Sequence, residues 1–313
     1  MSTRLTSLFS IRYPILQGGM AWVADAGLAA AVSNAGGLGI ISAFGLSSQE
    51  LRDQIIACKE LTVKPFGVNI MLKDPSAQEN AQIIAHEKVA LVTTGAGLPN
   101  RFMPIWLDAG VKVVPVVSTV ALARRVVRDG AAAVIAEGYE AGGHVGELTT
   151  MTLVPQIADA VDVPVIAAGG IADGRGLAAA LLLGASGVQV GTRFLAADEC
   201  GIPQCFKDEV LHARDTDTMV AGRRRGLPVR ALKNSYMQEL AEMELNPHVS
   251  NAELEQHGSG ALWRAVKEGD MVSGCIMAGQ AAALVKDTKP AREIILQMVE
   301  EARKLLTEGA ERL

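Results

Sequence analysis

Aromatic residues are scarce in this chain, and so are cysteines. Phe, Trp and Tyr make up 4% of the 313 residues, although hydrophobic residues reach 49%. The core must therefore be built from small and branched aliphatic side chains, which is typical of parallel α/β folds with strands buried on both faces. No CxxC pair and no zinc-like spacing to histidine is present, so we expect no metal site and four free thiols in a reducing compartment: Cys58, Cys200, Cys205 and Cys275.

The sequence also lacks a basic excess, a long apolar run and a phosphate loop of the ATPase type. Its net charge of −5 argues against a nucleic-acid surface, and the one basic cluster, at 223–225, is too short to form one. No uncharged run reaches transmembrane length, and residues 4–12 lack the apolar segment of a signal peptide. The sequence contains no P-loop motif, so we do not expect ATP chemistry. We expect a soluble, cytoplasmic protein that binds neither nucleic acid nor membrane.

Eight short apolar runs alternate with segments of helical periodicity. Helices are expected at 120–129, 151–161 and 173–183, and a terminal packing helix from Pro290 to Leu313. This alternation predicts an α/β fold, a TIM-like (β/α)8 barrel. A doubly wound open sheet is the alternative, but it would show fewer strands before its first long insertion. The expected strands are 13–16, 38–42, 66–71, 90–94, 112–117, 132–136, 164–168 and 187–190.

The pattern changes after about Arg193. Residues 200–275 are more polar and show no clear strand. We therefore expect a small helical subdomain at 200–275, inserted after strand eight as a lid or substrate-binding part. The barrel would then comprise 1–199 and 276–313.

Ligand-binding residues of a barrel lie just after each strand, and phosphate groups commonly bind after strands seven and eight. Gly169-Gly170 and Gly191-Thr192 occupy these two places. A simple turn remains an alternative for the first pair. Together the two motifs favour a phosphate-bearing cofactor. A mononucleotide such as FMN fits better than NAD in a Rossmann half, because Gly36-Gly37-x-Gly39 and Gly95-x-Gly97 are only fragments of that fingerprint.

The segment 136–146, after the sixth expected strand, combines four glycines, two acids and one histidine. Glycine lets backbone approach a ligand closely, and histidine exchanges protons near neutral pH. His144 is therefore the candidate catalytic residue; the other four histidines lie in charged or polar stretches. We interpret Glu137 as a flavin contact or, alternatively, as one half of an ion pair at the barrel rim. Glu140 is expected to shape the turn.

Seven sequence blocks carry a resemblance to a known family. The chain resembles the flavin-dependent enoyl-[acyl carrier protein] reductases II of the FabK type, within the wider nitronate monooxygenase (2-nitropropane dioxygenase) superfamily. The similarity spans nearly the whole chain and keeps its order. The blocks are YPILQGGMAWVA (13–24), AVSNAGGLGII (31–41), KPFGVNI (64–70), AEGYEAGGH (136–144), VIAAGGIA (165–172), VQVGTRF (188–194) and MAGQ (277–280).

The resemblance implies a barrel that binds FMN, with a smaller domain closing over it. It implies that His144 lies near the flavin ring as the catalytic histidine. The residues that it implies for FMN binding are Gly19, Met20, Asn69, Glu137, Gly142, Gly143, Gly169, Gly170, Gln189, Val190, Gly191 and Thr192.

For the reductase branch, the resemblance implies reduction of trans-2-enoyl thioesters in type II fatty acid synthesis. NADH or NADPH would supply the hydride, and a monovalent cation often assists. Nitronate monooxygenases usually carry Gln where this chain has Glu137, so Glu137 favours the reductase branch. Oxygen-dependent nitronate oxidation is the alternative, and a non-catalytic flavin-binding regulator is a third.

The expected partners are an acyl carrier protein or a CoA thioester, together with a second copy in a homodimer. An acyl carrier protein is acidic, so its docking patch should be basic. Arg223–Arg225 and Arg230 are candidates for that patch, or for binding the phosphate of a nicotinamide nucleotide.

Overall fold

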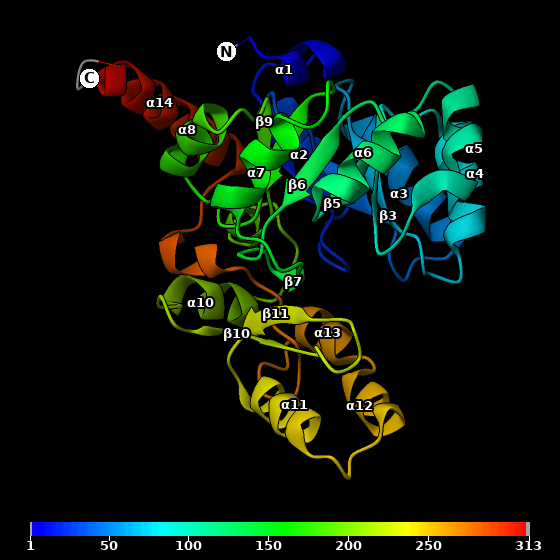
Figure 1. Cartoon of the computed structure of the whole chain (residues 1–313), viewed down its shortest axis with the longest axis vertical. Coiled ribbons are helices and arrows are strands. Elements are labelled where there is room, and N and C mark those ends of the chain that lie inside the picture. Colours follow the sequence, from blue (N-terminus) through cyan, green and yellow to red (C-terminus); the bar gives the residue numbers. More distant parts are fainter. Residues whose placement is uncertain (1, 311–313) are drawn as a thin grey trace.

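A barrel of eight parallel strands forms the larger part of the molecule (Figure 1). The computed structural model describes residues 2–310. The strand order is β1-β9-β8-β6-β5-β4-β3-β2, and a parallel bridge between Leu16 and Leu38 nearly closes the ring. The predicted TIM-like (β/α)8 barrel is confirmed. Its strands are β1 (Ile15–Gln17), β2 (Ile40–Ser42), β3 (Gly67–Met71), β4 (Leu91–Gly95), β5 (Lys112–Val117), β6 (Val134–Glu137), β8 (Val165–Ala168) and β9 (Gly187–Val190).

Helices surround this barrel and follow its strands in the chain (Figure 1). The expected helices at 120–129, 151–161 and 173–183 are present as α6, α7 and α8. The helices of the barrel region are α1 (Arg4–Phe9), α2 (Ala26–Asn34), α3 (Ser48–Leu61), α4 (Ala77–Glu87), η1 (Pro99–Arg101), α5 (Met103–Asp108), α6 (Val120–Arg128), α7 (Thr150–Ala158), α8 (Gly174–Leu182) and α9 (Thr192–Leu195).

Several helices begin where the sequence supplies a capping side chain. Thr119 caps α6 by accepting from the backbone N–H of Leu122, and Asp173 caps α8 in the same way. Gly130 follows α6 with a φ of +107°, a conformation that favours glycine. Such local signals explain why these helices could be located from the sequence.

The terminal helix α14 (Ala291–Ala310) packs against α8 and α2. It begins one residue after the predicted start at Pro290, and residues 311–313 of the predicted range lie outside the described part. Buried Ile295, Met298 and Ala302 form the expected apolar face. No helix within residues 2–310 is both long and apolar enough to cross a membrane.

The two ends of the barrel differ. Leu5 and Phe9 of α1 are buried in the same cluster as Leu16, Ile40 and other strand residues. The helix α1 therefore packs onto the barrel interior, since its apolar side chains belong to the same core. The carboxyl ends of the strands face the segment that follows β9 (Figure 1). This is the end at which barrels bind ligands.

The segment after β9 contains a small antiparallel sheet as well as helices. Strands β10 (Thr218–Ala221) and β11 (Val229–Leu232) pair with each other, and β11 also pairs with β7 (Gly143–His144). The expectation that 200–275 holds no clear strand is wrong. The helices are α10 (Gln204–His212), α11 (Ser235–Leu245), α12 (Asn251–Gly258), α13 (Ala261–Trp263), η2 (Arg264–Glu268) and, beyond it, η3 (Gln280–Leu284).

The missed strands have a physical explanation. Each is only four residues long, too short to show a clear alternation of apolar and polar side chains. The strand β7, which pairs with β11, lies 85 positions earlier in the glycine-rich segment (Val229 pairs with His144), so no local pattern predicts the pairing. We call residues 200–275 the lid; its boundaries stay a prediction. The lid has a hydrophobic cluster of its own, which includes Tyr236, Met237 and Leu254.

Candidate active site

A cavity of about 920 Å³ lies between the carboxyl ends of the barrel strands and the lid. The barrel contributes residues at or after the ends of all eight strands. The lid contributes Phe206 and residues 226–228, 258, 260, 262 and 263, and Met277 follows it. Ligand pockets commonly span about 300–1,000 Å³, so this cavity has room for a cofactor and part of a substrate.

The cavity brings together every predicted site residue except Val190. The side chain of Val190 is 1% exposed and belongs to the barrel core. The side chain is therefore not exposed to the cavity, and the expectation that Val190 binds the cofactor stays a prediction. The predicted residues that line the cavity are Gly19, Met20, Asn69, Glu137, Gly142, Gly143, His144, Gly169, Gly170, Gln189, Gly191 and Thr192.

Free backbone donors line the cavity where a phosphate is expected. Gly169 and Gly170 have φ angles of +93° and +75°, which favour glycine. Among the described residues, no acceptor pairs with the N–H groups of Gly170, Gly191 and Thr192. Backbone N–H groups without an acceptor, in residues that line a cavity, suit an anionic group. These residues therefore fit the phosphate of FMN.

Glycine has a second role in this site, because it lets distant segments of the chain approach each other. A Cβ on Gly142 would lie 2.6 Å from the carbonyl carbon of Ala278, and one on Gly19 would lie 2.1 Å from the Cβ of Asn69. Neither position tolerates a side chain without movement of its neighbour. Gly19 and Gly142 therefore also have a structural role, beside the cofactor contact predicted for them.

Glu140 shapes the turn, as expected. Its carboxylate accepts hydrogen bonds from the backbone N–H and the hydroxyl of Thr150, at 2.8 and 2.9 Å. Its carbonyl oxygen accepts from the N–H of Gln280, at 3.0 Å. Glu140 thus links the glycine-rich segment both to α7 and to the chain that returns from the lid.

His144 lies on β7, at the boundary between barrel and lid. It pairs with Val229 of β11, and the N–H of Val145 donates to the carbonyl of Pro228 at 3.1 Å. The imidazole is exposed to the cavity. Desolvation, and then the positive charge of Lys73, lower the pKa of His144 below its ordinary value of 6.5. The imidazole is thus mainly neutral at pH 7, able both to donate and to accept a hydrogen bond.

Glu137 ends strand β6 beside the phosphate-binding turn, since it pairs with Ala168 of β8. Burial raises the pKa of Glu137 to about 7. Within residues 2–310, its carboxyl group makes neither an ion pair nor a hydrogen bond. The alternative of a rim ion pair is therefore not observed. A carboxyl group that retains its proton near neutral pH can donate a hydrogen bond to a ligand.

Asn69 and Gln189 complete the polar lining. The side-chain amide of Asn69 donates to the hydroxyl of Thr93 at 2.9 Å, which orients the amide after β3. Gln189 lines the cavity from β9, next to Gly18. Each amide can donate hydrogen bonds to a ligand and accept hydrogen bonds from it.

Sequence reasoning missed several residues of the cavity. Lys73 lines it from the loop after β3, and nothing in its local sequence distinguishes it from other lysines. The ring of Trp22 packs edge-on against Phe44 and against Trp263 of the lid, with centroids 5.9 and 4.8 Å apart. Trp22 lies in the sequence block 13–24, but its lid partner could not be inferred from the sequence.

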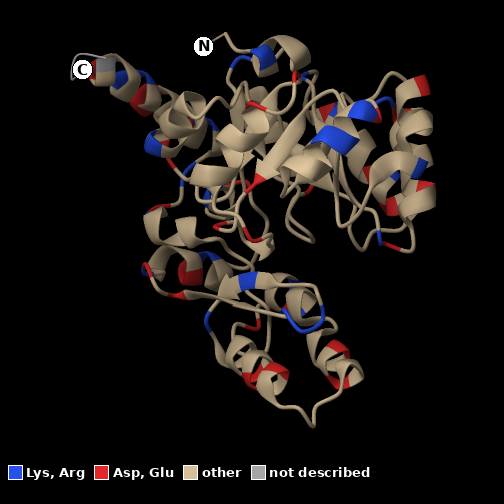
Figure 2. Ribbon diagram, in the orientation of Figure 1, with Lys and Arg blue, Asp and Glu red and all other residues tan. Residues whose placement is uncertain are grey.

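The predicted basic patch is smaller than expected. Arg230 is 3% exposed, and its guanidinium donates to the hydroxyl of Thr218 and to the carbonyl of Tyr139. It therefore cannot contact a docking partner. Arg223 and Arg224 are exposed on the turn between β10 and β11, where Figure 2 shows basic residues.

No group of three or more His, Cys, Asp or Glu side chains within the described residues could hold a metal ion. Three cysteines are buried, and Cys205 is exposed; none is in a disulfide.

Comparisons with known proteins give the chain a family. The family model described as nitronate monooxygenase matches residues 2–301. A relative from Rhodococcus jostii (strain RHA1) is 41% identical, over 77% of this chain and 68% of its own length. It is named (3aS,4S,5R,7aS)-5-hydroxy-7a-methyl-1-oxo-octahydro-1H-indene-4-carboxyl-CoA dehydrogenase.

Two solved structures share the whole architecture. The structure of FabK from Thermotoga maritima has a TM-score of 0.97 and 45% identity, covering 100% of both chains. A nitroalkane oxidase from Streptomyces ansochromogenes has a TM-score of 0.86 and 29% identity, covering 98% of this chain and 99% of the other. The resemblance that the sequence blocks indicated is thereby confirmed, and the chain belongs to the nitronate monooxygenase family.

Proposed function

We propose that this protein is an FMN-dependent oxidoreductase that reduces trans-2-enoyl thioesters with NADH or NADPH. The observation that carries the proposal is the likeness to FabK from Thermotoga maritima, which is 45% identical over both whole chains. The nitroalkane oxidase is more distant, at 29%. The Rhodococcus relative supports thioester chemistry independently, because its name specifies a CoA ester.

Different residues would hold the phosphate and the ring system of FMN. The N–H groups of Gly170, Gly191 and Thr192 would bind the phosphate, and the amides of Asn69 and Gln189 would contact polar atoms of the ring. When bound, the flavin supplies hydride transfer from the nicotinamide to the β-carbon of the enoyl group.

The side chains of this protein would perform the proton chemistry. Once the β-carbon is reduced, the α-carbon needs a proton. His144 faces the cavity, and its lowered pKa makes the imidazolium a stronger acid than free histidine. His144 would thus deliver the proton to the α-carbon and regain one from solvent. Glu137, with its carboxyl pKa raised to about 7, would keep the buried cavity wall uncharged at slightly acid pH.

The carrier would be CoA or an acyl carrier protein, as in type II fatty acid synthesis. The exposed side chains of Arg223 and Arg224 lie next to Gly226, Leu227 and Pro228, which line the cavity. Their positive charge suits the phosphates of CoA or the acidic surface of an acyl carrier protein. A homodimer and a stimulating monovalent cation belong to the same proposal.

The test follows the two half-reactions separately. Under anaerobic conditions, NADH should bleach the flavin absorbance of the holoenzyme, and crotonyl-CoA should restore it. His144→Ala should lower turnover of crotonyl-CoA by about 10²- to 10⁴-fold, the range of general acid catalysis. The exposed His86→Ala is the matched control and should keep full activity. Absence of reoxidation by any enoyl thioester offered would exclude the proposal.

Nitronate oxidation is the second candidate, supported by the family and by the nitroalkane oxidase structure. In that reaction His144 would act as a base, and no nicotinamide would be needed. Bleaching of the flavin by propyl nitronate without NADH, followed by oxygen uptake, would favour this candidate.

A further inference from the structure

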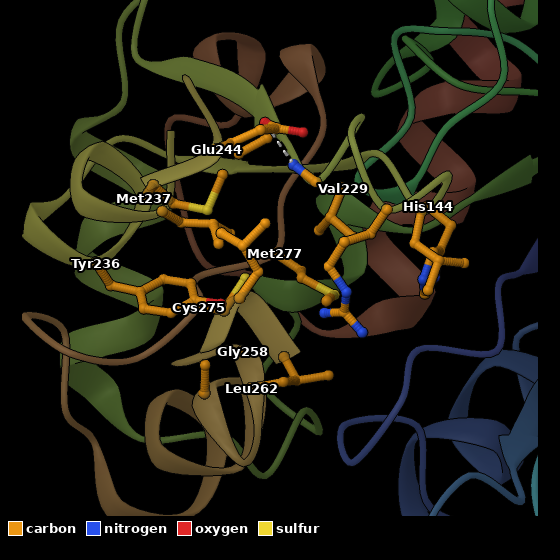
Figure 3. A pocket seen from close by; sticks show the side chains of 16 residues that line it. His144, Val229, Tyr236, Met237, Glu244, Gly258, Leu262, Cys275 and Met277 are labelled. Carbon is orange, nitrogen blue, oxygen red and sulfur yellow. Dashed lines mark hydrogen bonds between the residues drawn. The ribbon is translucent and has the colours of Figure 1, made fainter. Parts of the chain in front are cut away.

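A second cavity, of about 170 Å³, lies inside the lid next to His144 (Figure 3). Five residues line both this cavity and the larger one, so the two are adjacent: His144, Leu227, Gly258, Leu262 and Met277. We call the smaller cavity the lid pocket. Figure 3 shows His144 at one side of it and Met237 with Tyr236 at the opposite side. The lid pocket therefore extends away from the proposed reaction centre.

The lining of the lid pocket is mainly apolar. The side chains that line it away from His144 are at most 8% exposed, the value of Leu240. Its far part consists of buried side chains: Ala221, Tyr236, Met237, Leu240, Leu254, Ala261 and Cys275. Burial also raises the pKa of the Cys275 thiol to about 12 and raises the pKa of Tyr236. The pocket thus offers an environment of low polarity.

Two charged residues in the lining already have partners. The carboxylate of Glu244 accepts from the backbone N–H groups of Gly222 and Arg224. The guanidinium of Arg225 lies 3.7 Å from the exposed carboxylate of Glu255. A hydrocarbon group can therefore enter without leaving a buried charge unpaired.

We propose that the lid pocket binds the apolar end of the acyl group, so that the lid selects the chain length of the substrate. The inference rests on the proposed thioester reduction, in which His144 is next to the α-carbon. Carbons beyond the reacting pair can then pass between Leu227, Leu262 and Met277 into the pocket. A nicotinamide nucleotide does not suit the pocket, because a volume of about 170 Å³ is too small for it and most of the lining is apolar.

The size of the pocket sets a limit on chain length. A dry cavity of about 150 Å³ holds a six-carbon ring, so about 170 Å³ has room for roughly six carbons or slightly more. With about four carbons left in the larger cavity, the affinity should stop increasing near ten carbons. For acyl chains shorter than about ten carbons, each methylene that enters the pocket should strengthen binding of the acyl-CoA about fourfold.

Gly258 offers a way to fill the pocket. It ends α12, its backbone does not need the conformation reserved for glycine, and a Cβ there would meet only Arg225 and Tyr236, at 3.6 and 3.8 Å. These are ordinary contact distances. Gly258→Ala and Gly258→Leu therefore form a graded series. Gly309→Leu is the control, since Gly309 is also helical and a Cβ there meets no atom of residues 2–310 within 4 Å.

The test measures binding and turnover on the holoenzyme. Dissociation constants of saturated acyl-CoAs from four to fourteen carbons should fall about fourfold per methylene and level off near ten carbons. In Gly258→Leu the levelling should occur roughly four carbons earlier, because leucine supplies four side-chain carbons. In Gly258→Leu, the ratio of kcat/KM for decenoyl-CoA to kcat/KM for crotonyl-CoA should fall by at least tenfold. The same ratio should fall by less in Gly258→Ala and should stay unchanged in Gly309→Leu.

The outcomes separate this inference from the proposed function. A chain-length dependence that Gly258→Leu leaves unchanged would overturn the inference, even if crotonyl-CoA is reduced. A raised KM for NADH with unchanged chain-length selectivity would assign the pocket to the nicotinamide nucleotide and overturn it too. Binding that depends on chain length, without any enoyl turnover, would support the lid pocket and contradict the proposed reaction.

Discussion

The hydroxyl oxygen of Thr192 accepts a hydrogen bond from the backbone N–H of Gly279, at 2.9 Å. The bond is buried and joins residues 87 positions apart. Thr192 belongs to the proposed phosphate-binding turn after β9, and Gly279 to the segment that returns from the lid. One hydrogen bond thus couples the phosphate site to the position of the lid.

Replacing Thr192 by Val should destabilise the protein by about 1–3 kcal/mol. The valine has a similar shape but leaves the buried N–H of Gly279 without an acceptor. Urea unfolding of the flavin-free protein measures the loss, and FMN affinity should fall as well. Thr192→Ser keeps the hydroxyl and is the control. Equal stability of the valine and serine variants would show that the hydrogen bond does not contribute.

Gly142→Ala should destabilise the protein and displace the segment 277–280. The added methyl group would lie 2.6 Å from the backbone of Ala278 and the N–H of Gly279, and backbone cannot move aside as a flexible side chain can. Overpacking of this kind typically costs about 1–3 kcal/mol. Gly95→Ala is the matched control, because a Cβ on Gly95 meets nothing within 4 Å. Urea unfolding should show a loss only in the first variant.

The parts of this molecule that the sequence predicted depend on local signals. The eight strands and helices α6 and α8 follow from apolar runs, caps and glycines within a few residues. Side chains alternate along a strand, so Gln189 and Val190 must face opposite ways. That rule, applied to β9, distinguishes Gln189, whose side chain lines the cavity, from Val190, whose side chain is buried in the barrel core.

The parts that were missed depend on contacts between distant segments. The lid strands β10 and β11 form only with each other and with β7, and the ring of Trp22 meets that of Trp263 from the other end of the chain. The influence of Lys73 on His144 requires that the loop after β3 and the segment after β6 border one cavity. No pattern in a single stretch of sequence contains this information.

Protein stability should depend on pH through Glu137. Its pKa rises from the ordinary value of 4.5 to about 7 in the folded protein, so the folded state binds more protons than the unfolded state between these values. Stability should therefore fall as the pH rises from about 4.5 through about 7. At about 1.4 kcal/mol per pKa unit, the loss of stability at pH 8 is at most about 3.5 kcal/mol.

Glu137→Gln isolates this effect, because glutamine is neutral at every pH. Relative to the unmodified protein, the flavin-free variant should gain stability at pH 8 and little at pH 5. Urea unfolding at several pH values measures the difference. A Glu140→Gln variant is the comparison for a carboxylate that is hydrogen-bonded to Thr150, and it should lose stability at pH 8 instead. A difference between Glu137→Gln and the parent that stays constant with pH would contradict the prediction.

Lys73→Met should raise the pKa of His144. The ammonium group of Lys73 makes no ion pair within residues 2–310, and its charge is the second cause, after desolvation, of the lowered pKa of His144. Methionine keeps a similar length without the charge. The titration of the His144 imidazole, followed by NMR, should therefore move to higher pH, and the alkaline limb of the kcat profile should move with it. Lys64→Met removes an exposed charge that does not border the cavity and should leave both unchanged. Since desolvation remains in Lys73→Met, the pKa of His144 should stay below 6.5 in that variant. An equal shift of the His144 pKa in Lys64→Met would show that the effect comes from the net charge of the protein and not from a charge beside the cavity.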